Sequence, residues 1–468
     1  MKKIISIFAA SVILLPTFLL AGCGLFTDRS DTLKILNFAD YIDQSLLDDF
    51  KEYYKEKYDK DLNIIYDTSN TNENMYTKIA KGKEDWDLVC LSDYMIQRMQ
   101  REGLLQKLDY NLLTDPEDGN YDNISPFIKD SFYSLQGLTP GSSDLYSICY
   151  MWGTMGILYN TDYVDADEVL HWSVLWNEDY ADKIYMKDAV RDTVVAAILY
   201  LRQDEFLDLT MDLEEEDFFD SVTRNARQEL FNDVDIDFIK EIERVLKQQK
   251  SELSAKYDID FDKDEMARGA AYLNVAWSGD IGYAIMEASD GVNLAYSIPL
   301  EGSNLWFDGW VIPKYAKNTQ AANEFINFLL DIDNAIANME DTGFTSCVAS
   351  EEILEWAIEN WAENAEYYDE DFYSIDNEID VSYFFVDIDG ADSASVNPIA
   401  YTPIDDIARC MIMNDYSEAN NDLMLKMWTQ VKGGMPDYVY YVLSIALAII
   451  AALIIYFIIK NKRTNKKI

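Results

Sequence analysis

The stretch WDLVCLSDYM, residues 86–95, joins a short apolar run to three polar or aromatic residues. The run predicts a buried strand, and Ser92, Asp93 and Tyr94 follow at its carboxyl end. Upstream, LKILNF at 33–38 predicts another buried strand, and a helical run with one apolar face comes after it. Strands that alternate with helices in this way predict an α/β fold whose ligand groups gather at the ends of the strands.

Composition excludes several classes of function. The 468 residues include 85 Asp and Glu against 38 Lys and Arg, for a formal charge of −47. Hydrophobic residues make up 49% and aromatic residues 13%, which predicts a folded chain rather than a disordered acidic one. The acidity disfavours nucleic acid as a partner, since few cations could neutralise a phosphate backbone. With His171 as the one histidine, a Ser-His-Asp triad or a His-rich zinc site is also disfavoured.

Both ends of the chain have the pattern of membrane attachment. Residues 1–22 combine two lysines with an apolar run, which predicts an export signal, and Cys23 closes a Leu-Ala-Gly-Cys motif that predicts lipidation. Residues 438–460 are long and apolar enough for a transmembrane helix, and the basic tail 461–468 is expected in the cytoplasm. The region between them is then expected outside the cell membrane.

Other segments give weaker indications. The alternating acids from Asp258 to Asp264 lack the glycine and glutamate of a calcium loop, and we interpret them as a solvated charge run. Residues 361–400 are acidic and aromatic without a period, which favours an insertion or an extended surface loop. Four further cysteines fit buried thiols and disulfides equally well, and none has metal-ligand spacing. They are Cys90, Cys149, Cys347 and Cys410.

Taken together, an ordered set of strings resembles the spermidine/putrescine-binding proteins of ABC transporters. It covers most of residues 33–350, and the match is poor from about 351 to 410. The set comprises LNFADYID (36–43), NENMYTKI (72–79), WDLVCLSDYMIQRM (86–99), YSICYMWGTMGILYN (146–160), DAVRDTVVAAILYL (188–201), VAWSGDIGYAI (275–285) and LWFDGWVIPKYAKN (305–318).

This resemblance implies a two-lobed periplasmic-binding-protein fold of class II with a hinge. One lobe would comprise 33–143 plus 308–350, and the other 144–307 plus 351–434. The ligand would lie in the cleft between them, and the lobes would close around it.

A polyamine is a chain of methylenes that carries ammonium groups, so its recognition calls for carboxylates and aromatic walls. The resemblance places such residues in the cleft, with Asp308 as the first candidate for an ammonium partner. Asp188 and Asp192 share a helix face, and the alignment leaves open which of them enters. The candidate residues are Phe38, Asp40, Tyr41, Ser92, Asp93, Tyr94, Asp188, Asp192, Trp277, Trp306, Asp308, Phe344 and Asn414.

Some positions depart from the family pattern. Phe38 stands where the family has Trp, and Phe344 replaces a Tyr, while the last polar position falls at Asn414 or Asp415. A diamine or a triamine would suit this cleft, and related families bind other organic solutes or ferric ions.

The sequence therefore predicts a membrane-attached solute-binding component of an ABC importer, without enzymatic activity, cofactor or bound metal. Its expected partners are a polyamine, the permease subunits and their ATPase. A ligand-sensing ectodomain is the alternative, although the tail at 461–468 is too short to hold a signalling domain.

Overall fold

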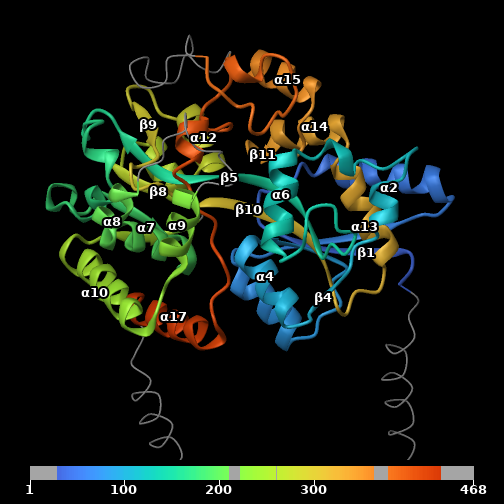
Figure 1. The fold of residues 1–468 in the computed structure, drawn as a ribbon, viewed down its shortest axis with the longest axis horizontal. Helices are drawn as coiled ribbons and strands as arrows, with labels where there is room; N and C mark the ends of the chain where they lie inside the picture. Colours follow the sequence, from blue (N-terminus) through green and yellow to red (C-terminus); the bar gives the residue numbers. More distant parts are fainter. Residues whose placement is uncertain (1–28, 210–221, 260, 363–377, 434–468) are drawn as a thin grey trace, which may run out of the picture.

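The computed structural model describes residues 29–209, 222–259, 261–362 and 378–433. Within these ranges the elements form two groups that lie side by side, on the right and on the left of Figure 1. The expected signal peptide at 1–22, the lipidation site Cys23, the membrane helix at 438–460 and the tail at 461–468 lie outside the described residues. Across the ranges that are described, no helix is long and apolar enough to cross a membrane.

The first group contains the amino-terminal strands. Its strands are β1 (Thr32–Asn37), β2 (Asn63–Thr68), β3 (Leu88–Ser92), β4 (Leu105–Gln106) and β11 (Thr345–Ser346). Its helices are α2 (Ser45–Tyr58), α3 (Asn72–Tyr76), α4 (Asp93–Arg101), α5 (Tyr110–Leu113), α6 (Pro126–Leu135), α13 (Thr319–Leu329), α14 (Ile332–Thr342) and α15 (Glu351–Ala362). The two expected strands at 33–38 and 86–91 are thus present as β1 and β3.

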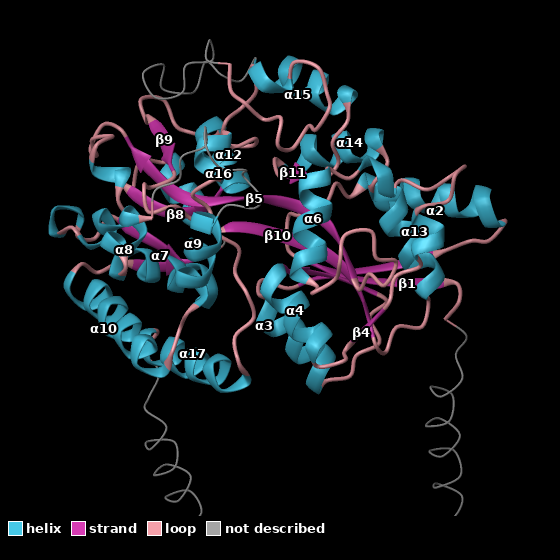
Figure 2. Cartoon of the chain, in the orientation of Figure 1, coloured by secondary structure: helices cyan, strands magenta, loops and turns pink. Residues whose placement is uncertain are grey.

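The second group is built in the same way. Its strands are β6 (Ile184–Lys187), β7 (Lys256–Asp258), β8 (Leu273–Trp277) and β9 (Leu294–Ser297). Its helices are α7 (Val190–Leu201), α8 (Gln203–Asp208), α9 (Val222–Asn232), α10 (Ile236–Glu252), α11 (Asp262–Ala267), α12 (Ser278–Met286), α16 (Ile404–Ile407) and α17 (Glu418–Val431). Figure 2 shows these helices arranged around the strands of this side.

Two long strands, β5 (Ser147–Asn160) and β10 (Leu305–Pro313), connect the groups. The strand order is β2-β1-β3-β10-β5-β8-β6-β7, and β1 pairs in parallel with both β2 and β3. β10 lies antiparallel between β3 and β5, and β5 continues into antiparallel pairing with β8. All 14 residues of β5 are buried, so the connection between the groups is itself part of the core.

The carboxyl ends of strands from both groups meet at the centre of the molecule. β1 and β3 end near β10, where Ser92 pairs with Asp308, and β8 ends at Trp277 opposite Met155 of β5. These are the strand ends at which the sequence predicted ligand groups.

For the acidic stretch 361–400 we expected an insertion or an extended surface loop; residues 363–377 of it lie outside the described residues, and from residue 378 onward its aromatic side chains are buried rather than exposed. Phe384 and Tyr401 are fully buried, and the Phe384 ring stacks on Trp152 with centroids 5.0 Å apart. Burial of its aromatic side chains explains why this segment is ordered against the core. The four cysteines between Cys90 and Cys410 are all buried and free.

Candidate functional site

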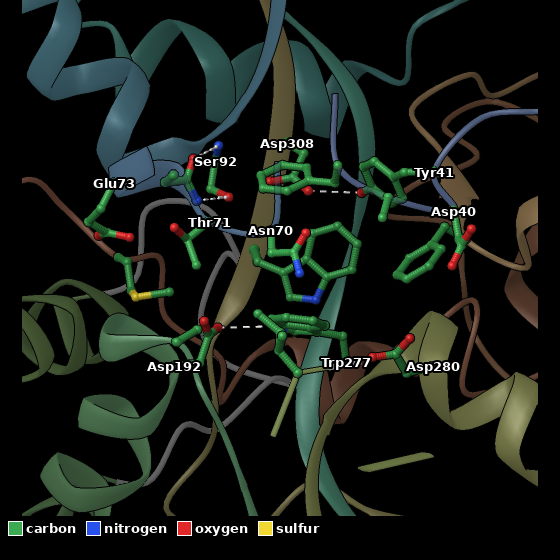
Figure 3. A pocket seen from close by; sticks show the side chains of 18 of the residues that line it. Asp40, Tyr41, Asn70, Thr71, Glu73, Ser92, Asp192, Trp277, Asp280 and Asp308 are labelled. Carbon is green, nitrogen blue, oxygen red and sulfur yellow. Dashed lines mark hydrogen bonds between the residues drawn. The ribbon is translucent and has the colours of Figure 1, made fainter. Parts of the chain in front are cut away.

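A cavity lies between the two groups and is lined from both sides. Its empty volume is about 1080 Å³, including the part that is open to solvent. Ten of the thirteen predicted residues line it: Phe38, Asp40, Tyr41, Ser92, Tyr94, Asp192, Trp277, Trp306, Asp308 and Phe344. Figure 3 shows side chains from both sides pointing toward one another across this space.

Asp308 stands in the middle of one wall. It belongs to β10 and lies opposite Ser92 of β3, and its Oδ2 accepts a 2.9 Å hydrogen bond from the Tyr41 hydroxyl. Asp308 is 8% exposed, and burial raises its pKa to about 6, although hydrogen bonds from Ser92 and Tyr41 oppose the shift. Among the described residues no cation lies within 4 Å of this carboxylate. Its negative charge at neutral pH is therefore available to a ligand cation.

Asp192 supplies a carboxylate from the other wall. It lies in the first turn of α7, and its Oδ1 accepts a 3.0 Å hydrogen bond from Trp277 Nε1. Burial also raises its pKa to about 6. Because Asp192 contributes to the raised pKa of Asp308, the two acids act on the same region of the cavity. A bound cation between them would relieve that repulsion.

Aromatic rings form the apolar surfaces of the cavity. Phe344 packs edge-on against Tyr41, with centroids 4.8 Å apart, and against Trp306 at 6.0 Å. Close approach of backbone makes room for these rings, since a Cβ at Gly279 would lie 2.4 Å from the Phe344 ring and one at Gly153 would lie 2.6 Å from the Trp306 ring. Such walls suit methylene groups and favour cations over the ring faces.

A third carboxylate in the wall, Asp280, has cations of its own. Lys187 Nζ lies 2.8 Å from its Oδ2 and Lys263 Nζ lies 3.1 Å from its Oδ1. Lys187 also contacts Asp262 at 2.7 Å, and both of these side chains are fully buried. Burial works to raise the pKa of Asp280, but the two ammonium groups outweigh it and lower that pKa. Asp262 was expected in a solvated charge run, which is wrong for this residue.

The segment after β2 was missing from the predicted site. Asn70, Thr71, Asn72 and Glu73 line the cavity, and Glu73 accepts a 3.1 Å hydrogen bond from the Tyr94 hydroxyl. Asn72 donates to Ser92 Oγ at 2.9 Å. A sequence signal existed, because β2 runs parallel to β1 and its carboxyl end must reach the same edge.

Three predicted residues do not line the cavity. Asp93 is fully buried behind it and accepts from the backbone of Tyr94 at 2.6 Å, which follows from its place at the start of α4. Asp188 instead forms an ion pair with Lys432.

Asn414 lies one residue past Met413, which does line the cavity, and its Oδ1 accepts a hydrogen bond from Gln97 Nε2 at 3.0 Å.

Chemically, this arrangement suits binding rather than catalysis. The carboxylates and aromatic rings could hold an organic cation, since charge-assisted hydrogen bonds and cation–π contacts both favour it. In the part of the chain that the structure describes, no cluster of three or more acidic, histidine or cysteine side chains could hold a metal ion.

Comparisons with known proteins agree with this geometry. The spermidine/putrescine-binding periplasmic protein of Salmonella typhimurium is 28% identical over 335 residues, covering 71% of this chain and 82% of that protein. The putrescine-binding periplasmic protein SpuD of Pseudomonas aeruginosa is 29% identical and covers 66% of this chain and 76% of its own length. The resemblance inferred from the sequence is confirmed.

Solved structures and a family profile extend the match. An ABC transporter protein of Listeria monocytogenes superposes with a TM-score of 0.61 at 25% identity, covering 86% of this chain and 99% of that one. The spermidine/putrescine substrate-binding protein PotD of Streptococcus pneumoniae has a TM-score of 0.55 at 26% identity and the same coverage. Both support the α/β periplasmic-binding-protein fold.

Residues 46–366 match the bacterial extracellular solute-binding proteins. The chain therefore belongs to this family, whose members are binding proteins rather than enzymes.

Proposed function

We propose that this protein is the extracytoplasmic solute-binding component of an ABC importer and that its cargo is a polyamine. The observation that carries the proposal is the pair Asp308 and Asp192, two acids in one aromatic-walled cavity that form no ion pair among the described residues, although the field of Lys187 reaches Asp192. The names of the similar proteins, which refer to spermidine and putrescine, support the same cargo class.

The contacts that we propose follow from the two chemical parts of a polyamine. Its ammonium groups would lie against Asp308 and Asp192, with Glu73 as a further acceptor, and each charge-assisted hydrogen bond would contribute about 1.5–3 kcal/mol. Its methylenes would lie between the rings of Trp306 and Trp277. The predicted residues Phe38, Asp40, Tyr41, Ser92, Tyr94 and Phe344 would complete the walls.

We propose that the two groups of elements are the lobes of a closing receptor. The division expected from the resemblance, 33–143 plus 308–350 and 144–307 plus 351–434, is kept with one change. Helix α15 packs against α14, and Trp356 Nε1 donates to Glu340 at 3.0 Å, so α15 is assigned to the first lobe. Closure would bring Asp308 of one lobe toward Asp192 of the other, which links cargo binding to the closed state.

The proposal includes attachment to the outer face of the cell membrane. It rests on sequence alone: the export signal at 1–22 with lipidation at Cys23, and the apolar stretch 438–460 followed by the basic tail 461–468. A tethered receptor would remain near the permease and ATPase to which it delivers cargo.

The test is isothermal titration of the full-length chain, purified in a non-ionic detergent, with putrescine, spermidine and citrate. We expect micromolar or tighter binding of an amine, no binding of citrate, and a loss of about 10- to 100-fold in Asp308→Asn. Asp237→Asn removes an exposed carboxylate from α10 and serves as the matched control. Equal, weak and salt-sensitive binding of both amines in all variants would contradict the proposal, because general acidity alone would produce it.

A further inference from the structure

Asp280 and the lysines around it carry an inference about which polyamine the cavity takes, and it rests on the proposed function. We infer that Lys263 acts as a built-in ammonium group that occupies Asp280 and restricts the cavity to a cargo with two ammonium groups rather than three. The cargo class is therefore a diamine such as putrescine.

The first step is the geometry of Lys263 itself. Its side chain is 23% exposed and lines the cavity, and its Nζ lies 3.1 Å from Asp280 Oδ1 and 4.8 Å from the centre of the Tyr283 ring. A carboxylate at 3 Å and an aromatic ring are the partners that a cargo ammonium would seek. The Lys263 ammonium group therefore occupies a position that would suit a ligand cation.

The second step is the charge of the group. Lys187 and Lys263 balance Asp262 and Asp280, so the four side chains together are neutral. Lys187 also lies 4.3 Å from the centre of the Trp277 ring, which gives that ring a cation from the protein. An additional ammonium at this end would meet two positive charges and no unpaired carboxylate of the group.

The third step is the position of the group within the cavity. In Figure 3, Asp192 and Asp280 lie on opposite sides of Trp277, and Asp308 faces the space between them. Asp192 and Asp308 can serve two ammonium groups. Glu73 lies on the side of Asp192, whose pKa it helps to raise, so it would share the ammonium group at that end. A third ammonium group, at the other end, would have to lie near Asp280. Asp40 also lies toward that end, but it is exposed, and an exposed carboxylate contributes little to binding.

The experiment removes the built-in cation. In the full-length chain, titrations with putrescine and spermidine give the ratio of the two dissociation constants for wild type and for Lys263→Met. We expect wild type to prefer putrescine, and Lys263→Met to bind spermidine about tenfold more tightly while putrescine changes by less than about threefold, because Asp280 Oδ1 becomes available to the third ammonium.

Two controls separate this effect from general electrostatics. Lys240→Met removes an exposed lysine of α10 that does not line the cavity, and should leave the ratio unchanged. Lys263→Arg keeps a cation beside Asp280 and should keep the wild-type ratio. The gain for spermidine should also disappear in Lys263→Met combined with Asp280→Asn; if this double variant does not fold, Lys263→Arg makes the same distinction.

Several outcomes would overturn the inference. A wild-type preference for spermidine would do so directly, as would an equal gain for both amines in Lys263→Met or an equal gain in Lys240→Met. If wild type binds neither amine, the proposed function fails and the inference fails with it. Binding of amines with an unchanged ratio in Lys263→Met overturns the inference alone.

Discussion

Asp308 and Asp280 line the same cavity, but their surroundings give them opposite roles. Asp308 has a tyrosine hydroxyl as its partner, and burial raises its pKa to about 6. Asp280 is held between two lysines, which lower its pKa against the effect of burial. An acidic side chain in a binding cavity is thus available to a cation only when the protein has not already supplied one. On the proposed function, Asp308 remains available to the ligand, whereas the carboxylate of Asp280 is already held in ion pairs within the protein.

The largest expected effect is a loss of stability, and it tests the structural role of the ion pairs around Asp280. Lys187→Met would leave Asp262 and Asp280 buried with Lys263 as the remaining cation, so we expect the free energy of unfolding to fall by about 3–5 kcal/mol. Urea unfolding followed by circular dichroism measures the change. Lys240→Met, at an exposed pair, should change stability by less than about 1 kcal/mol. A similar small change in both variants would contradict the comparison.

Asp308→Asn should raise the free energy of unfolding of the unliganded protein, whereas Lys187→Met should lower it. The raised pKa means that the folded protein holds the Asp308 proton more tightly than the unfolded chain, so this group destabilises the fold as pH rises from its ordinary value of 3.8 to about 6. The shift corresponds to about 3 kcal/mol. Asparagine keeps the shape without the charge, and at pH 7 we expect higher stability by up to that amount. Lower stability of Asp308→Asn at pH 7 would show that the carboxylate is structural.

The same acids predict how binding depends on pH. Polyamine ammonium groups stay protonated between pH 5 and 7, whereas Asp308 and Asp192 both titrate at a pKa of about 6. A cation that requires both acids ionised should bind about 100-fold more weakly at pH 5 than at pH 7. Titrations across this range measure it, and Asp308→Asn should reduce the change to about tenfold. A flat profile in wild type would exclude these two acids as the cargo's partners.

How far the sequence predicted this site depended on whether a residue's neighbours in space could be inferred. Tyr41 follows β1, and Ser92 and Trp277 are the last residues of β3 and β8; the strand pattern with the family resemblance placed them in the cavity. Asn70 comes shortly after a strand as well, but no residue of β2 is buried and its apolar pattern is weak. The parallel pairing of β2 with β1 nevertheless brings this strand end to the same edge of the sheet.

The contacts of Asp280 could not be predicted in this way. Its partner Lys187 is 93 residues away in sequence, and Lys263 stands in an acidic run that reads as a solvated surface. Local composition gave the wrong environment for Asp262 because burial was set by packing against a distant strand end. The expectation of a surface loop in the aromatic segment after residue 378 overlooked a contact of the same kind, since Phe384 is buried against Trp152 of β5. Contacts between residues far apart in sequence, rather than residue types, determine whether these side chains are buried.

The smallest expected effect separates residues that face the cavity from residues behind it. Asn414 joins the two groups: its Oδ1 accepts from Gln97 of α4, and its backbone N–H donates to Asn232 of α9 at 2.8 Å. Asn414→Ala removes one hydrogen bond between the groups, worth about 0.5–1.5 kcal/mol. Because this bond favours the present arrangement of the groups, its loss should weaken binding of both amines by about two- to tenfold, through faster dissociation measured by stopped flow.

A double-mutant cycle with Gln97→Ala decides whether this contact acts as a single unit. Gln97 also accepts a hydrogen bond from the backbone of Asp415 at 2.7 Å, so its loss should cost at least as much as that of Asn414. The two changes together should then be clearly less than additive, because they remove the same bond. The ratio of the putrescine and spermidine dissociation constants should stay constant throughout, since neither side chain reaches the cargo. A change in that ratio of tenfold would instead make Asn414 a ligand residue, and the boundary drawn between Met413 and Asn414 would have to move by one residue.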